Sequence, residues 1–321
     1  MFKLFNEITL RGVDGISCIK INPWKQEVLA LSTWNGFVDC YDIFINERIN
    51  RINLDCPMLA VEWISVNDIA SAGADGIVYI NGTQIGFHNA PISSLAFSIS
   101  TQILASGSYD GIVKFWNTKT KKFITEFVTD DKIYCMAPSP PSEIVCGCGE
   151  NRMIHIDCQT NVSTNEKTLM HGYNTRSIAA CESMTAVSVV QGRIAVINRN
   201  NSSKTYAFKA HLNEPKNDTY ESTKTVYPVN TIAFQPNTDF LASGGTDGAI
   251  YIWDVKIKRK VQSLCDVNDK LFQTSVSSLS FSSDGMYLAA AISYCFEHGP
   301  IEHAPDRLVI YRKDDIVRNS K

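Results

Sequence analysis

The chain has 321 residues, of which 44 % are hydrophobic and 20 % charged, and its net charge is −3. This length suits two conventional domains or one large all-β domain. The slight negative charge excludes an overall positive field for nucleic acid or an anionic membrane, so any anion site must be local. Apolar runs are too short for a transmembrane helix or a signal peptide, so we expect a soluble protein that is not secreted.

Ten cysteines are scattered along the chain without any CxxC pair. Cys146 and Cys148 form the closest pair, but one intervening residue in a strand-like run does not match zinc spacing. His298 and His303 share one loop with two glutamates, which we interpret as a solvated acidic loop. We therefore expect buried free thiols in a reducing compartment, with no metal and no cofactor.

In chain order, the first predicted element is a lone strand at residues 7–10. A repeated pattern follows, in which an apolar strand, a turn such as Asp-Gly or Asn-Gly, and a second alternating strand succeed one another. Its copies lie at residues 29–41, 69–80, 104–116, 145–156, 186–197 and 241–253. A seventh copy, at residues 276–311, has a loop at residues 293–306 instead of the tight turn. Between the fifth and sixth copies, residues 213–225 form a polar insertion.

Each copy fits a unit of four short strands in about 40 residues, and long amphipathic helices are absent. One four-stranded sheet cannot cover both its faces, so the units must stack, and radial closure hides most strand edges. We predict an all-β, seven-bladed β-propeller that forms a single domain over residues 1–321. The N-terminal strand, at about residues 6–10, would complete the last blade and close the ring.

Two tryptophans indicate the type of repeat. Trp116 and Trp253 end the third strand of their copies, and Trp253 with Asp254 forms the WD dipeptide, so the propeller is of the WD-repeat type. We interpret both indoles as core packing. His88 stands where such repeats place a histidine that hydrogen-bonds an aspartate of the next turn, here Asp110.

The sequence offers no catalytic constellation. Residues 107–111 carry Tyr at the centre of a hairpin turn rather than a nucleophilic Ser, and neither a phosphate-binding loop nor a His-Glu-x-x-His motif occurs. An enzyme with a site in the central channel is the alternative, but no paired nucleophile and base supports it. We predict no catalytic residues and a protein that is not an enzyme.

Positive charge is concentrated in the fifth unit. Residues 172–210 carry a net charge of +4, which leaves −7 for the rest of the chain. Arg176 opens the first strand of this unit, Arg193 follows its central turn, and Lys209 closes its fourth strand. In a four-stranded antiparallel unit these three positions share one rim, and a bound carboxylate or phosphate would relieve their repulsion. Acidic groups of neighbouring blades, or simple solvation, are the alternatives.

Further residues near the turns complete the candidate set. Arg199 and Lys204 flank the opposite turn of the fifth unit, and we interpret both as solvated charges. Trp34 and Tyr109 each precede a turn on the rim that carries Arg176. Exposed aromatic side chains at a rim are typical peptide anchors, although either ring could pack on its own blade.

Several segments resemble a known family, the spindle-checkpoint WD-repeat proteins of the budding-uninhibited-by-benzimidazole type, over essentially the whole chain. These segments are GRIAV (192–196), YAFKAH (206–211), YPVNTIAF (227–234), ASGGTDG (242–248), and SY (293–294) with EH (302–303). The WD-repeat messenger-RNA export factors, which dock on a nucleoporin, are a related branch. The Glu-His loop is more similar to the checkpoint branch.

The resemblance implies a non-catalytic adaptor in the nucleus and at the kinetochores of mitotic chromosomes, with a cytoplasmic pool. Its top face would bind the acidic GLEBS segment of a checkpoint kinase or its relative through Trp34, Tyr109 and Arg176. Arg193 and Lys209 would meet the phosphate of a phosphorylated MELT-type peptide of the kinetochore scaffold. No DNA or membrane partner is implied, and the propeller would be monomeric within a complex. The alternative is an export or nuclear-pore factor that binds a nucleoporin GLEBS segment.

This chain departs from the family pattern at two places. The family often has Trp where this chain has Tyr109, which keeps a ring but loses the indole N–H. The family also often reads Cys-His-Arg where this chain reads Ala210, His211 and Leu212. One expected cation is therefore missing, and we expect the rim to bind its acidic peptide less tightly or through a different contact.

Overall fold

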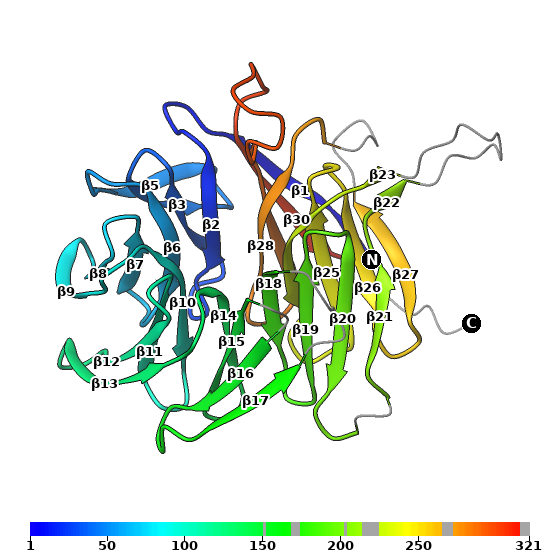
Figure 1. Cartoon of the computed structure of the whole chain (residues 1–321). Coiled ribbons are helices and arrows are strands. Elements are labelled where there is room, and N and C mark those ends of the chain that lie inside the picture. The colour runs from blue at the N-terminus through cyan, green and yellow to red at the C-terminus, as the bar shows by residue number, and fades with distance from the viewer. Residues whose placement is uncertain (150–151, 168–173, 202–203, 214–224, 265–271, 315–321) are drawn as a thin grey trace.

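The chain forms a ring of seven small antiparallel sheets, or blades (Figure 1). The computed structural model describes residues 1–149, 152–167, 174–201, 204–213, 225–264 and 272–314. No α-helix occurs among these residues, and the predicted seven-bladed WD-repeat propeller is confirmed. The same residues contain no helix of the length and apolarity that a bilayer crossing requires.

The blades follow one another along the chain, and each has four strands. Blades 1 to 3 consist of β2 (Ile16–Ile21), β3 (Val28–Thr33), β4 (Phe37–Asp42) and β5 (Glu47–Asn53); β6 (Met58–Trp63), β7 (Ile69–Gly73), β8 (Ile77–Ile80) and β9 (Thr83–Phe87); and β10 (Ile92–Ser98), β11 (Ile103–Ser108), β12 (Ile112–Asn117) and β13 (Lys122–Val128). Blades 4 and 5 consist of β14 (Ile133–Ser139), β15 (Glu143–Cys148), β16 (Arg152–Asp157) and β17 (Ser163–Lys167); and β18 (Thr175–Ala180), β19 (Met184–Val189), β20 (Arg193–Asn198) and β21 (Tyr206–Lys209).

Blades 6 and 7 complete the ring. Blade 6 consists of β24 (Val229–Phe234), β25 (Phe240–Gly245), β26 (Ile250–Asp254) and β27 (Arg259–Leu264), and blade 7 of β28 (Val276–Phe281), β29 (Tyr287–Ile292), β30 (Arg307–Lys313) and β1 (Phe2–Thr9). Between blades 5 and 6, β22 (Leu212–Asn213) and β23 (Thr225–Val226) form a two-stranded ribbon. The predicted polar insertion falls mainly on residues 214–224, outside the described residues.

The N-terminal strand closes the ring, as predicted, but it is longer than the sequence pattern indicated. It begins at Phe2 and pairs antiparallel with β30. Phe2 also reaches blade 6, where its backbone N–H donates to Gln262 Oε1 at 2.9 Å. Near the other end of the strand, Arg307 of β30 donates to Glu7 at 2.8 Å. β1 therefore joins the last blade to its neighbour as well as completing it.

Tight turns and apolar interfaces explain this architecture. Gly192, in the turn between β19 and β20, has a φ of 65°, and a Cβ there would lie 2.5 Å from the His211 carbonyl oxygen. Only glycine fits such a turn without strain. The core lies between blades, where Val, Ile, Leu and Ala of adjacent sheets pack face to face. The nine described cysteines are all free thiols, many of them within these interfaces.

Two buried polar networks hold turns of blades 3 and 6. His88 Nδ1 lies 3.2 Å from Asp110 Oδ2, as predicted, and its Nε2 lies 2.8 Å from Ser106 Oγ. The Trp116 indole N–H donates to the same Ser106 oxygen at 2.8 Å. An equivalent network, which the sequence analysis missed, consists of His211, Asp247, Ser243 and Trp253. Both tryptophans are thus structural, because their polar atoms are satisfied inside the blade.

The His88 network predicts an acid-sensitive stability. Burial lowers the pKa of the His88 imidazole below its ordinary value of 6.5, against the opposing effect of Asp110. The unfolded chain therefore binds a proton more readily, so stability is full above about pH 6.5 and falls on acidification, by at most about 1.4 kcal/mol per pH unit for one group. We expect His88→Asn to be less stable at pH 7.5 but to lose less between pH 7.5 and 5.5. Urea unfolding at both pH values tests this, and an unchanged pH dependence would contradict it.

Candidate functional site

Two cations face each other across neighbouring strands of blade 5. Arg193 is the first residue of β20 and Lys209 the last residue of β21, and the two are direct cross-strand partners. Both side chains are exposed, and no carboxylate among the described residues lies within ion-pair distance of either. Like charges directly opposite each other destabilise a sheet. An anion bound between the two would remove this repulsion.

Arg176 lies on the same rim but at its inner side. It is the second residue of β18, the innermost strand, at a bulge between Thr175 and Ser177 that can re-aim a side chain. Burial raises the pKa of the Tyr109 hydroxyl, and the positive charge of Arg176 opposes that rise. Burial likewise raises the pKa of the Cys295 thiol to about 11, again against Arg176. Because these groups belong to blades 3 and 7, Arg176 lies at the mouth of the central channel.

Tyr109 shares this mouth with a residue that the sequence analysis missed. Tyr109 is 37 % exposed, and its ring lies 5.9 Å from the ring of Tyr134, centroid to centroid, at an interplanar angle of 60°. Tyr134 is the second residue of β14, the position that Arg176 occupies in the next blade. Aligning first strands, rather than turns alone, would have found it. The two tyrosines and Arg176 form what we call the channel mouth.

Trp34 lies on the same rim, in the turn between β3 and β4 of blade 1. The residue is 53 % exposed, although its ring packs against Gly15, where a Cβ would come within 2.8 Å of Trp34 Cδ1. Within the described residues, no contact joins Trp34 to Arg176, Arg193 or Lys209. The predicted residues thus occupy one rim in three places: blade 1, the channel mouth, and the Arg193 and Lys209 pair.

The guanidinium of Arg199 has partners in the neighbouring blade. Arg199 was expected to be solvated, but its guanidinium forms an ion pair with Glu143 of blade 4 and donates to Ser139 Oγ at 2.8 Å. The sequence interpretation was wrong because the partners belong to the neighbouring blade, 56 and 60 residues away. Lys204, by contrast, is exposed to solvent.

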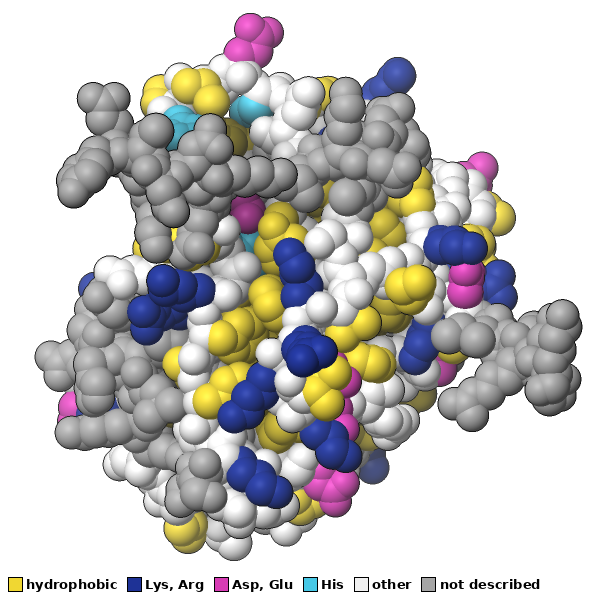
Figure 2. Space-filling view, turned by 90° about the vertical axis from the view of Figure 1, so that its right-hand side faces the viewer, with side chains coloured by type: hydrophobic (Ala, Val, Ile, Leu, Met, Phe, Trp, Pro, Cys, Tyr) yellow, Lys and Arg dark blue, Asp and Glu magenta, His cyan; other side chains and the backbone are white. Residues whose placement is uncertain are grey.

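A second basic surface lies on the outer face of blade 6. Figure 2 shows Lys and Arg side chains gathered over the face that contains β21 and β27. On this blade, Lys258 and Lys260 have ammonium groups 4.4 Å from the Tyr206 ring centroid and 4.3 Å from that of Tyr251, respectively. These contacts are within cation–π range, so both charges already have ring partners.

At residues 210–212, where the sequence departs from the family pattern, the structure shows the roles of His211 and Leu212. His211 is fully buried and bonded to Asp247, so it belongs to the blade 6 network and not to the rim. Leu212 lies in the ribbon strand β22, paired with Val226. A hydrophobic residue thus stands where the related family often carries a cation.

Comparisons with known proteins agree with this architecture. The model of the WD domain, G-beta repeat, matches residues 83–117 and 219–254. The mitotic checkpoint protein bub3 of Dictyostelium discoideum is 32 % identical, over 96 % of this chain and 94 % of its own. The poly(A)+ RNA export protein of Schizosaccharomyces pombe is 26 % identical, over 91 % of this chain and 85 % of its own. The solved structure of U3-55K has a TM-score of 0.78 at 17 % identity, over 96 % of this chain and 98 % of that one.

The fold and the two networks define the class: this is a WD-repeat β-propeller. The near full-length similarity at 32 % identity narrows the class further, and the chain belongs to the Bub3 family of mitotic checkpoint proteins. The resemblance seen in the sequence is therefore confirmed, and the chain is a spindle-checkpoint WD-repeat protein.

Proposed function

We propose that the chain is a non-catalytic adaptor of the spindle assembly checkpoint that works in the nucleus and at kinetochores. Its top face, the rim that carries Trp34, Tyr109, Arg176, Arg193 and Lys209, binds two acidic ligands. One is a GLEBS-type segment of a checkpoint kinase or its relative, and the other is a phosphorylated peptide of the kinetochore scaffold.

The observation that supports this most is the opposed pair Arg193 and Lys209 on an exposed rim. Two cations held by adjacent strands can engage a phosphate from both sides, Arg through paired hydrogen bonds and Lys as a point charge. The channel mouth offers a different chemistry, a cation beside two tyrosine rings, which suits a longer acidic segment with apolar side chains. The two ligands would therefore bind side by side on the same rim.

The GLEBS part of the proposal is tested by titrating a fluorescein-labelled GLEBS-type peptide of a checkpoint kinase. We expect Arg176→Glu to weaken binding about 100-fold, because a charge-assisted contact of about 1.5–3 kcal/mol is replaced by repulsion. We expect Trp34→Ala to weaken it about 10-fold or more, as for a truncated aromatic anchor.

The matched control is Lys204→Glu, which makes a full charge reversal at an exposed position of the same blade near the opposite turn. It should bind like the parent. Circular dichroism and thermal melting check that each variant is folded. Unaltered affinity in a folded Arg176→Glu variant would refute this part of the proposal.

The similarity to the RNA export protein gives the second candidate, a factor that binds a nucleoporin GLEBS segment through the same rim. Affinity purification from dividing cells separates the two. Checkpoint kinases and kinetochore proteins in the purified complex would support the adaptor, whereas nucleoporins in their place would support export.

A further inference from the structure

One repeating position fills the interfaces between blades. At this position, a residue of the third strand of a blade pairs across the sheet with a residue near the start of the second strand. In blades 1, 3, 4, 5, 6 and 7 this residue is Tyr41, Trp116, Ile156, Ile197, Trp253 and Tyr311. Each of these large side chains packs in the apolar cluster that joins its blade to the preceding one.

Blade 2 has a small polar residue at this position. Asn81 takes the equivalent place, because its backbone N–H donates to the Ile69 carbonyl at 2.9 Å. Its side chain is also used locally, with Oδ1 accepting from Ile69 N–H at 2.9 Å and Nδ2 donating to Asp68 at 2.7 Å. The amide cannot fill the space that an indole or phenol fills in blades 1, 3, 6 and 7, although the Trp63 indole packs in the same interface and lines the space that remains.

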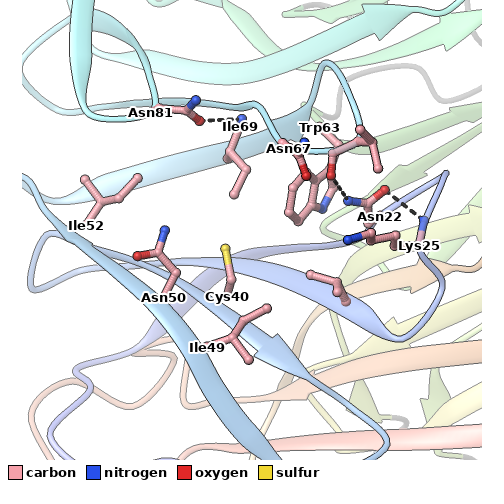
Figure 3. A pocket seen from close by; sticks show the side chains of 12 residues that line it. Asn22, Lys25, Cys40, Ile49, Asn50, Ile52, Trp63, Asn67, Ile69 and Asn81 are labelled. Atoms are coloured by element: carbon pink, nitrogen blue, oxygen red, sulfur yellow. Dashed lines mark hydrogen bonds between the residues drawn. The ribbon is translucent and has the colours of Figure 1, made fainter.

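A cavity of about 530 Å³ remains between blades 1 and 2 (Figure 3). Its volume lies within the range of about 300–1,000 Å³ that is typical of ligand sites. Cys40, Ile52 and Ile69 come from three different strands around it and give it apolar walls. The lining residues include strand ends and turns of the rim opposite to Arg176, so the cavity is separate from the proposed peptide rim.

The mouth of the cavity is polar and carries one cation, that of Lys25, while the nearby Asp68 carboxylate is already bonded to Asn81 and Ser65. Asn50 and Asn67 line it, and within the described residues no hydrogen bond engages either side-chain amide. Lys25 also lines it, exposed and without a carboxylate partner in the described part of the chain. Ile49 is 54 % exposed beside them. Free amides suit the backbone of an extended peptide, and the single unpaired charge favours a carboxylate.

We propose that this cavity receives an aromatic side chain from an extended segment of a partner protein, with a neighbouring acidic residue that pairs with Lys25. Trp116 and Trp253 are the internal templates, since each inserts an indole at the equivalent interface of its own blade. The partner's ring occupies the space that the Asn81 side chain leaves unfilled. The site does not depend on the top rim, so one propeller can hold a second partner while its rim is occupied.

The test uses N-acetyltryptophan as the probe, followed through the methyl NMR signals of Ile49, Ile52 and Ile69. We expect saturable shifts at these methyl groups. N-acetyltryptophanamide, which lacks the carboxylate, should bind about 3-fold more weakly, and Lys25→Ala should abolish this difference, as expected for an exposed ion pair. N-acetylaspartate, which lacks the ring, should cause no shift at the three isoleucines.

Variants of β5 provide the structural control. Asn50→Trp places an indole at the cavity and should remove probe binding, whereas Asn53→Trp makes the same change at an exposed position of the same strand outside the cavity and should bind like the parent. Asn50→Trp should keep the affinity of the top rim for its peptides, because position 50 lies in the middle of β5, away from that rim. The proposal is overturned if no methyl shift saturates up to roughly 10 mM probe, or if a folded Asn50→Trp variant binds the probe as the parent does.

Discussion

Replacing Arg193 by Glu should abolish the preference of the protein for a phosphorylated MELT-type peptide over the unphosphorylated one. A charge-assisted contact to phosphate contributes about 1.5–3 kcal/mol, and reversing the charge adds repulsion, so we expect affinity for the phosphopeptide to fall about 100-fold. Lys209→Glu should have a similar effect. Because both cations contact one phosphate, the double variant should lose less than the product of the two single losses. Fluorescence anisotropy with both peptides measures these effects.

The same substitution should not harm the fold, and this separates binding from stability. Arg193 now faces Lys209 across the sheet, and a carboxylate at position 193 would turn a repelling pair into an attractive one. Such cross-strand pairs contribute about 0.2–1 kcal/mol, so the melting temperature should stay equal or rise slightly. Lys204→Glu is again the control and should keep the preference for phosphate. A folded Arg193→Glu variant that still prefers the phosphopeptide would contradict the proposed role.

Deleting residues 2–9 should unfold or aggregate the protein. The deletion exposes the edge of β30, with which β1 pairs along its length, and such an open edge promotes association between chains. It also removes Phe2 and Ile8, which are 5 % and 7 % exposed, and displaces Leu10. Burying three such side chains contributes roughly 5–9 kcal/mol, which is comparable to the whole stability of a typical domain. Size-exclusion chromatography and thermal melting measure the outcome.

Neighbouring residues of the strand provide a graded control. Phe2→Ala removes a buried ring and should lower stability by about 3–5 kcal/mol. Lys3→Ala changes the next residue, whose side chain is 75 % exposed and forms an ion pair with Asp314, and should shift stability by less than about 1 kcal/mol. A deletion variant that stays monomeric and melts like the parent would show that ring closure does not need β1.

The turn residues and alternating strands were enough to predict the blades, because both signals are local. A glycine such as Gly192 marks a hairpin by its need for positive φ, and period-two alternation marks the strands beside it. The same local reasoning placed Arg176, Arg193 and Lys209 on one rim, since strand direction within a blade fixes which ends lie together. Their placement on that rim agrees with the strands of the structure.

What the sequence by itself determined was therefore each blade, the number of blades and the rim to which each end belongs. Only the tertiary structure decided which residues contact one another across the interfaces between neighbouring blades. Arg199 finds Glu143 in blade 4, Tyr109 approaches Tyr134, and Asn81 leaves a cavity against blade 1. The physical reason is that contacts across an interface join residues tens of positions apart, and no turn or periodicity within one repeat encodes them.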